Sequence, residues 1–157
     1  GINAEYGENF MKHNRTLYMN LFQNLNKSKE PKISISQLQY AAARLGVNIS
    51  QDKITSIINT CFRGQQQLND EDFCQFLYVL DNANLDDPKT ILFLAADLDY
   101  SGTIDLGELK NILPKLAFKF STNDIEFLFL KCKDNADGTM SYEMFIELVE
   151  QLRDVFK

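Results

Sequence analysis

The stretch DLDYSGTIDLGE (residues 97–108) decides the fold, because it sets oxygen-bearing side chains at regular intervals around one glycine. Apolar helix patterns flank it, with ILFLAA directly before it and LKNIL directly after it. This layout predicts a helix, a tightly curled polar loop and a second helix. A solvated acidic turn is the alternative, but such a turn would not require Gly102, Ile104 and Glu108 in this register.

The oxygen-bearing positions of this loop fit the ligand pattern of a calcium site. Calcium is a hard cation that takes about six to eight oxygen ligands. We expect ligands from the side chains of Asp97, Asp99 and Ser101, the backbone carbonyl of Thr103, Asp105 directly or through a water, and both carboxylate oxygens of Glu108. Gly102 permits the sharp turn, and Ile104 is expected to point into the core.

Three other stretches repeat the helix–loop–helix pattern. The apolar residue inside each loop sets the register, because Leu68, Ile104 and Met140 are spaced 36 residues apart. Ile33 has the same role in a weaker first unit, 35 residues before Leu68. An unrelated all-α bundle with chance similarity between its loops is the alternative, and three units in one register argue against it.

The fourth loop, KDNADGTMSYEM (133–144), keeps the middle of the pattern and loses its ends. Lys133 puts an ammonium where the first carboxylate should lie, and Met144 offers a thioether that a hard ion does not favour. Gly138 and Met140 keep the loop able to fold against its neighbour. We therefore expect no ion in this loop, which serves as a structural partner of the third unit.

The first two loops also lack the calcium pattern. The second, CFRGQQQLNDED (61–72), begins with Cys61 and has Gln66 at the glycine position. The first, NKSKEPKISISQ (26–37), has Pro31 at that position. We expect neither to hold metal, so the whole chain should bind one calcium ion.

These residues and the four-unit layout resemble the EF-hand superfamily, and within it the calmodulin, troponin C and myosin light chain group. The resemblance covers residues 15–156. It implies an all-α fold of two lobes, each a pair of EF-hand helix–loop–helix units with a short two-strand contact between the loops. The polar break DNANLDDP (81–88) suggests an N-terminal lobe at 1–83 with two degenerate hands. The C-terminal lobe, 84–157, would pair the intact hand with a degenerate one.

Local signals predict some helix ends. Asp87 followed by Pro88 is typical of an N-cap with proline at the first helical position. Ser121 resembles the start of a capping box, with an acid three residues later. Pro114 predicts a kink, or an early helix end near Leu113, because proline removes one backbone hydrogen bond.

Composition narrows the function. The 157 residues are 45% hydrophobic, which is enough for a core, and no apolar run approaches the ~20 residues of a membrane span. The net charge of −6, without a basic run, argues against nucleic acid as a partner. We recognise no secretory signal peptide and expect a cytoplasmic monomer.

The reactive side chains do not suggest an enzyme. Cys61, Cys74 and Cys132 form no C-x-x-C pair and are expected to be reduced thiols. His13 is the single histidine, so no nucleophile–base constellation can be assembled. We predict a non-enzymatic protein.

Three hypotheses on function remain open. In the first, the chain is a calcium sensor or adaptor that binds one ion in the third hand and engages an amphipathic helix of a protein target. In the second, it is a constitutive light-chain-like subunit with little calcium switching. In the third, it is the calcium-regulatory portion of a larger enzyme, such as a calcium-dependent kinase. The stretch FLFL (127–130) is a candidate groove lining, although such stretches are more often core.

Overall fold

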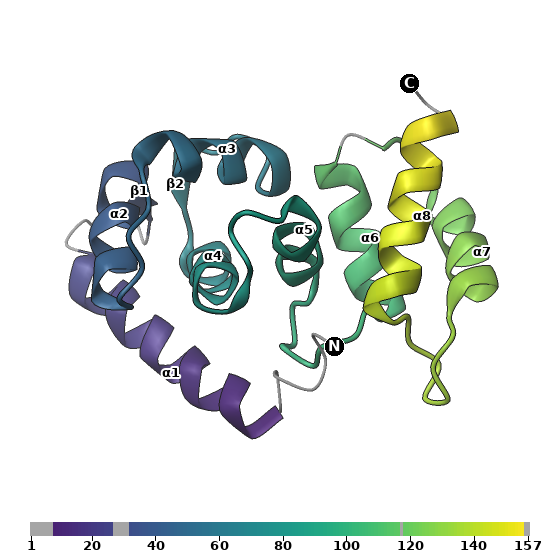
Figure 1. The fold of residues 1–157 in the computed structure, drawn as a ribbon, viewed down its shortest axis with the longest axis horizontal. Coiled ribbons are helices and arrows are strands. Elements are labelled where there is room, and N and C mark those ends of the chain that lie inside the picture. The colour runs from purple at the N-terminus through teal and green to yellow at the C-terminus, as the bar shows by residue number, and fades with distance from the viewer. Residues whose placement is uncertain (1–7, 27–31, 117, 156–157) are drawn as a thin grey trace.

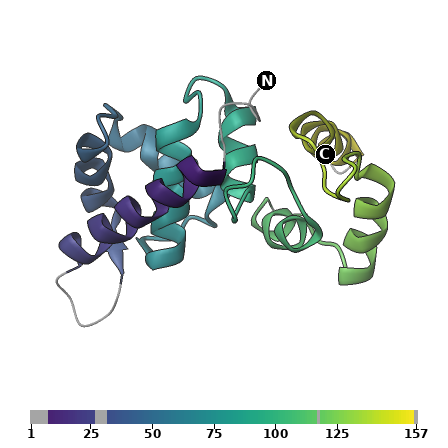
Figure 2. The ribbon, with the colours of Figure 1, turned by 90° about the horizontal axis from the view of Figure 1, so that it is seen from below.

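The computed structural model describes residues 8–26, 32–116 and 118–155 and is built mainly of helices. Its elements are α1 (Glu8–Leu25), β1 (Ile33–Ser34), α2 (Ile35–Arg44), α3 (Gln51–Cys61), β2 (Gln67–Leu68), α4 (Asp70–Asn82), α5 (Pro88–Ala96), α6 (Leu106–Lys115), α7 (Thr122–Cys132) and α8 (Tyr142–Val155). Helices α1 and α2 lie at one end of the molecule and α7 and α8 at the other, as two perpendicular views show (Figures 1 and 2). The predicted all-α, two-lobe fold is confirmed.

Two predicted helix starts are confirmed by their capping bonds. The Asp87 carboxylate accepts a hydrogen bond from the backbone N–H of Lys89, and Pro88 occupies the first helical position of α5. The Ser121 hydroxyl accepts from the N–H of Asp124 at 3.1 Å at the start of α7. Each cap satisfies a backbone donor that the helix itself cannot satisfy.

Pro114 lies in the last turn of α6, which ends at Lys115. Proline has no N–H, and its ring crowds the preceding turn, so a helix rarely continues far beyond it. The N–H of Leu116 closes the end by donating to the carbonyls of Ile112 and Leu113, both at 3.1 Å. The helix therefore ends soon after Pro114, at Lys115, two residues later than the predicted end near Leu113.

The loops pair through short antiparallel contacts, as the EF-hand resemblance implied. In the N-terminal lobe, Ile33 of β1 lies opposite Leu68 of β2. In the C-terminal lobe, Ile104 and Met140 form a bridge in which each N–H donates to the other carbonyl, at 3.0 and 2.8 Å. All four side chains are fully buried. The common register of the loops therefore sets which residues meet between them.

The two halves of the chain pack directly on each other. The rings of Tyr78 in α4 and Tyr100 in the third loop are stacked, with centroids 4.1 Å apart. The Lys115 ammonium at the end of α6 lies 3.8 Å from the Asp72 carboxylate of the second loop. The predicted boundary at residues 83–84 stays a prediction, and the elements on its two sides share a buried contact surface.

The stretch FLFL (127–130) is only partly core. Phe129 is buried, whereas Phe127 is 59% exposed and Leu130 is 63% exposed. Successive residues of a helix point in different directions, so four consecutive apolar residues cannot all face the interior. The expectation that this stretch is core is therefore wrong for two of its residues.

The three cysteines differ in how far they are buried. Cys61 and Cys74 are buried free thiols, and Cys132 is a half-buried one. Across the described ranges, no helix has both the length and the apolar character needed to cross a membrane.

Candidate metal centre

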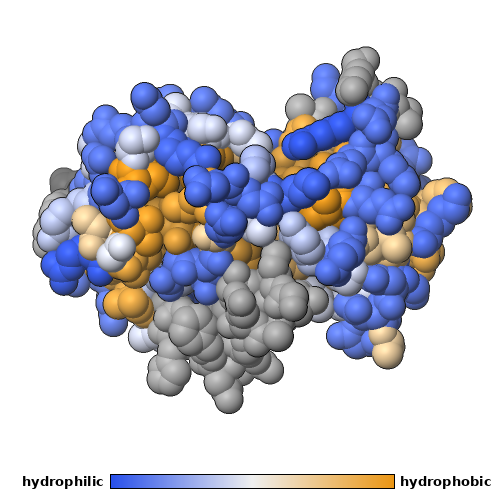
Figure 3. Space-filling model, in the orientation of Figure 1, coloured by the Kyte–Doolittle hydropathy of each residue, from blue (hydrophilic) through white to orange (hydrophobic). Residues whose placement is uncertain are grey.

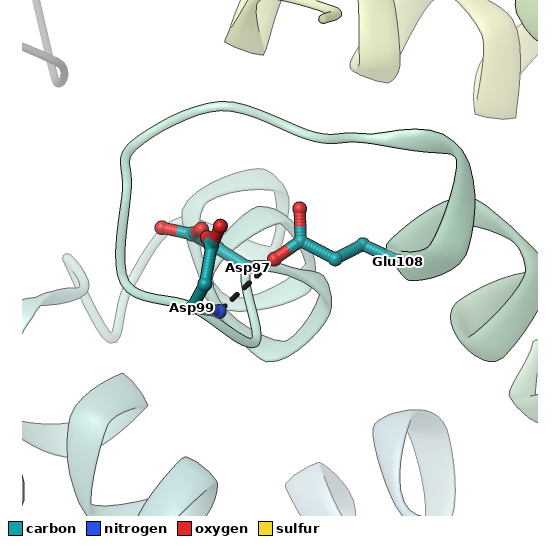
Figure 4. A group of neighbouring side chains, drawn as sticks. All are labelled: Asp97, Asp99 and Glu108. Atoms are coloured by element: carbon teal, nitrogen blue, oxygen red, sulfur yellow. Dashed lines mark hydrogen bonds between the residues drawn. The ribbon is translucent and has the colours of Figure 1, made fainter.

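The loop between α5 and α6 brings three carboxylates together. Asp97 ends α5, Asp99 follows in the loop, and Glu108 lies in the first turn of α6. One carboxylate oxygen from each lies within 4.8 Å of the other two. The side chains converge on the space enclosed by the loop (Figure 4). Three of the six predicted ligand residues thus form one oxygen cluster.

The curl of the loop is fixed by two residues with positive φ. Tyr100 has a φ of 57° and Gly102 has a φ of 81°, which is the conformation that glycine adopts most readily. The N–H of Gly102 donates to Asp97 Oδ2 at 2.8 Å, and the N–H of Ser101 donates to Asp97 Oδ1 at 3.0 Å. The sharp turn expected at Gly102 therefore wraps the loop around the Asp97 carboxylate.

The far end of the loop is held by Glu108. Its two carboxylate oxygens accept hydrogen bonds from the N–H of Asp99 at 3.1 Å and from the N–H of Asp105 at 2.9 Å. Asp105 in turn caps α6 by accepting from the N–H of Glu108 at 2.8 Å. Asp105 and Glu108 therefore form a capping box. The sequence analysis missed this role, although an acid three residues before a glutamate is a recognisable signal for it.

The two remaining predicted ligands lie beside the carboxylates. The Ser101 hydroxyl is 3.3 Å from Asp97 Oδ1 and 3.2 Å from the backbone carbonyl oxygen of Thr103. The oxygen atoms predicted as ligands in Ser101, Asp97 and Thr103 are therefore joined to one another by hydrogen bonds.

Burial penalises the charged form of two of the three carboxylates, Asp97 and Glu108, whereas Asp99 is exposed. Burial raises the pKa of Asp97 to about 7, against the opposing hydrogen bonds from Tyr78 and Gly102. Burial also raises the pKa of Glu108 to about 9. For Asp99, burial acts in the same direction, but hydrogen bonds from Ser101 and other neighbours lower its pKa overall.

The chemistry of the donors tests which ion fits. Every atom that the loop offers is oxygen, whereas zinc sites usually contain histidine nitrogen or cysteine sulfur. Three carboxylates this close together, two of them buried, favour a divalent cation that offsets their mutual repulsion. The residues of the loop therefore fit calcium.

Two residues outside the loop also hold it, and the sequence analysis missed both. The Tyr78 hydroxyl donates to Asp97 Oδ2 at 2.7 Å. The Gln75 side-chain Nε2 donates to the backbone carbonyls of Leu94 and Asp97, at 2.6 and 3.1 Å. Both residues lie on α4, in the preceding hand, and no local sequence pattern marks this contact.

The second loop is closed by side chains of the protein. The Gln65 Nε2 donates to the Asp72 carboxylate at 3.1 Å and to the Phe62 carbonyl at 3.0 Å. A neutral amide thus links the start of this loop to its last position, where a calcium loop would share an ion between its ends. This arrangement is consistent with the expected loss of ligation.

The fourth loop is closed in a similar way by an aspartate. The N–H and the hydroxyl of Ser141 each donate to the Asp134 carboxylate, both at 2.7 Å. The Ser141 hydroxyl also accepts from the N–H of Met144, at 3.2 Å, in the first turn of α8. Protein hydrogen bonds therefore join the start of this loop to the helix that leaves it.

In the first loop, Gln37 makes the corresponding link. Its Oε1 accepts from the N–H of Ser34 at 3.0 Å, and its Nε2 donates to the carbonyl of Leu25 at 3.2 Å. Pro31, the residue predicted to disturb this loop, lies outside the described residues.

Comparison with known proteins identifies relatives of similar length. No family model matches the chain. The myosin regulatory light chain cdc4 of Schizosaccharomyces pombe is 31% identical, over 82% of this chain and 89% of that protein. A myosin regulatory light chain of Physarum polycephalum is 27% identical, over 82% of this chain and 87% of its own. Calmodulin-like protein 4 of Mus musculus is 26% identical, over 84% of this chain and 88% of that protein. These relatives and the paired helix–loop–helix units show that the chain belongs to the EF-hand superfamily, alongside the myosin light chains and calmodulin-like proteins.

Proposed function

We propose that this chain is a calcium-binding regulatory protein that holds one Ca²⁺ in the loop 97–108 and engages a helix of a protein target. The observation that carries the proposal is the convergence of Asp97, Asp99 and Glu108, whose carboxylate oxygens lie within 4.8 Å of one another. The relatives support it, because they are named as myosin light chains and a calmodulin-like protein.

The proposed ligands run from the residue that follows α5, through the loop, to the first turn of α6. They are the side chains of Asp97, Asp99 and Ser101, the carbonyl of Thr103, Asp105 directly or through a water, and both carboxylate oxygens of Glu108. When bound, calcium supplies positive charge to carboxylates that burial otherwise penalises. Asp97 belongs to the end of α5 and Glu108 to α6, so shared ligation constrains the angle between these helices. The other three loops end in Gln37, Asp72 and Met144 instead of glutamate, which supports a single ion.

A groove between α3, α5 and α8 offers a place for the target. It has a volume of about 230 Å³, and its lining includes Leu92, Ile146 and Val149, with Lys89, Glu150 and Arg153 among the charged residues. Figure 3 shows the surface hollowed between the two ends of the molecule, with apolar surface in the hollow. The exposed Phe127 and Leu130 add apolar surface on α7. The net charge of −6 favours a basic partner, so we infer a basic amphipathic helix as the target of a cytoplasmic monomer.

A constitutive light-chain-like subunit is the second candidate. Two of the relatives are named as myosin regulatory light chains, and three of the four loops lack the glutamate of the calcium pattern at their last position. In this alternative, the calcium site stabilises the C-terminal lobe without changing how the partner is held. The names of the relatives support a non-enzymatic role in both cases.

Calorimetric titration of the metal-free protein with calcium, at near-physiological magnesium, tests the proposal. We expect one site with a dissociation constant of about 10⁻⁷–10⁻⁵ M, and loss of that site in Glu108→Gln. An apolar fluorescent probe added to the same samples separates the two candidates, because only the sensor exposes apolar surface on binding calcium. Absence of binding below about millimolar calcium would contradict the sensor function and leave a constitutive subunit whose loop 97–108 serves only its shape.

A further inference from the structure

We propose that Tyr78, which lies on α4 outside the loop, is a positioning residue of the calcium site and acts through Asp97. The inference rests on the proposed calcium site in the loop 97–108. It makes the preceding hand, whose own loop is closed by side chains, a part of the site.

The two oxygens of the Asp97 carboxylate have different partners. The Oδ2 atom accepts from the Tyr78 hydroxyl at 2.7 Å and from the N–H of Gly102 at 2.8 Å. The Oδ1 atom accepts from the N–H of Ser101 at 3.0 Å, within the loop itself. Tyr78 on α4 and Gly102 in the loop therefore hold Oδ2 together, whereas Oδ1 accepts from Ser101.

The ring of Tyr78 is fixed by its neighbours. It stacks on the ring of Tyr100 at a centroid distance of 4.1 Å and an interplanar angle of 19°. Tyr100 in turn meets Tyr18 edge-on at 6.3 Å, and the Arg15 guanidinium lies 5.1 Å from its centroid. Tyr78 is fully buried. Its hydroxyl therefore has a defined position, as a positioning residue requires.

Helix α4 also holds the backbone at the same place. Gln75, three residues before Tyr78 and so on the same side of the helix, donates to the carbonyls of Leu94 and Asp97. Gln75 and Asp97 are both buried. The carboxylate and the main chain of the first ligand are thus held from one helix, which fixes where that ligand lies relative to the rest of the loop.

The expected effect of removing the hydroxyl follows from the general behaviour of such contacts. Hydrogen-bond partners of metal-ligating groups typically change metal affinity by about 10–100-fold when they are lost. Tyr78→Phe keeps the ring, and thus the stacking on Tyr100. We expect it to raise the calcium dissociation constant by about tenfold or more.

Tyr18→Phe is the matched control. Tyr18 is a buried tyrosine of the same aromatic cluster, and its hydroxyl donates to Asp81 at 2.6 Å rather than to a predicted ligand. We expect its calcium affinity to stay within about twofold of that of the unaltered protein. Urea unfolding of both metal-free variants shows whether they are folded and similarly stable.

The experiment is calorimetric titration of calcium into the unaltered protein, Tyr78→Phe, Tyr18→Phe and Glu108→Gln. A second measurement uses terbium, whose luminescence lifetimes in H₂O and D₂O count the waters on the ion. A loosened Asp97 should admit additional water in Tyr78→Phe but not in Tyr18→Phe. A merely structural role for Tyr78 would not change that count.

The outcomes separate this inference from the proposed function. Weaker binding and an extra water in Tyr78→Phe alone support the positioning role. Equal affinity in the unaltered protein and Tyr78→Phe overturns the inference and leaves the calcium site standing, as does equal weakening in both tyrosine variants. Absence of calcium binding in the unaltered protein overturns the site and the inference together.

Discussion

Replacing Asp134 by alanine should loosen the fourth loop, although we infer that no ion binds there. Both hydrogen bonds from Ser141, one from the N–H and one from the hydroxyl, reach the Asp134 carboxylate at 2.7 Å. Asp134 lies at the start of the loop, and Ser141 lies directly before α8. The substitution therefore removes a direct link between the two ends of the loop.

The size of the effect can be estimated from these two bonds. A hydrogen bond to a charged group contributes about 1.5–3 kcal/mol to the free energy of unfolding. Asp134 is exposed, so solvent reduces each contribution to roughly 0.5–1 kcal/mol. The sum, about 1–2 kcal/mol, corresponds to a decrease in Tm of about 2–8 °C for a chain of this size.

Thermal unfolding by circular dichroism measures the decrease, and amide hydrogen exchange locates it. Protection of the Ser141 N–H should fall by about 5–30-fold, and that of Ile104, bonded to Met140 across the loops, should fall with it. Asp134→Asn keeps one acceptor oxygen and should lose about half as much stability. Asp86→Ala removes an equally exposed carboxylate elsewhere and serves as the control for charge. A Tm within about 1 °C of the unaltered protein, with unchanged Ser141 exchange, would refute this account of how the loop is closed.

Two further predictions concern the glycines and the thiols. Gly138→Ala should lower the free energy of unfolding by about 1–2 kcal/mol because φ is +85° there, although the added Cβ would meet no atom within 4 Å. Gly107→Ala, in α6, should instead leave the free energy of unfolding unchanged or raise it by up to about 1 kcal/mol. Urea denaturation measures both variants, and an equal loss of stability in the two would contradict the role given to the positive φ of Gly138. With a thiol reagent at pH 8, Cys132 should react before the other two cysteines, as mass spectrometry can follow. Burial raises the pKa of Cys61 to about 12 and that of Cys74 to about 11, so both stay protonated as well as shielded. Labelling of Cys61 or Cys74 ahead of Cys132 would show that the core opens more readily than the structure implies.

The pairing of the loops could be predicted because the sequence repeats at a fixed interval and because the EF-hand resemblance implies that neighbouring loops pair. One apolar residue at a fixed place in each loop is enough to predict that Leu68 meets Ile33 and that Met140 meets Ile104. Helix starts at Asp87 and Ser121 were equally accessible, since a cap is decided within about four residues.

Contacts that no repeat or local motif marks could not be predicted in this way. Tyr78 and Asp97 are 19 residues apart, and their hydrogen bond depends on how α4 packs against the third hand. The bond between Asp134 and Ser141 depends on the shape of a loop whose pattern indicated only that calcium ligands were missing. The exposure of Phe127 depends on which neighbours cover α7, and a run of apolar letters carries no such information.

Side-chain closure of three loops has a consequence for thermodynamic linkage. An ion that binds only the folded state adds a stability of RT ln(1 + [L]/Kd), which is about 2.7 kcal/mol at a hundredfold excess over Kd. With the one site that we propose, this gain is a single term rather than the sum of four. Hands closed by Gln37, Gln65 and Asp134 hold their shape through covalently attached groups, whose local concentration does not vary with the cell's calcium. A fall in calcium should therefore relax the third hand and leave the rest of the protein folded, so the signal is read as a local change of shape and the chain is not exposed to unfolding between signals.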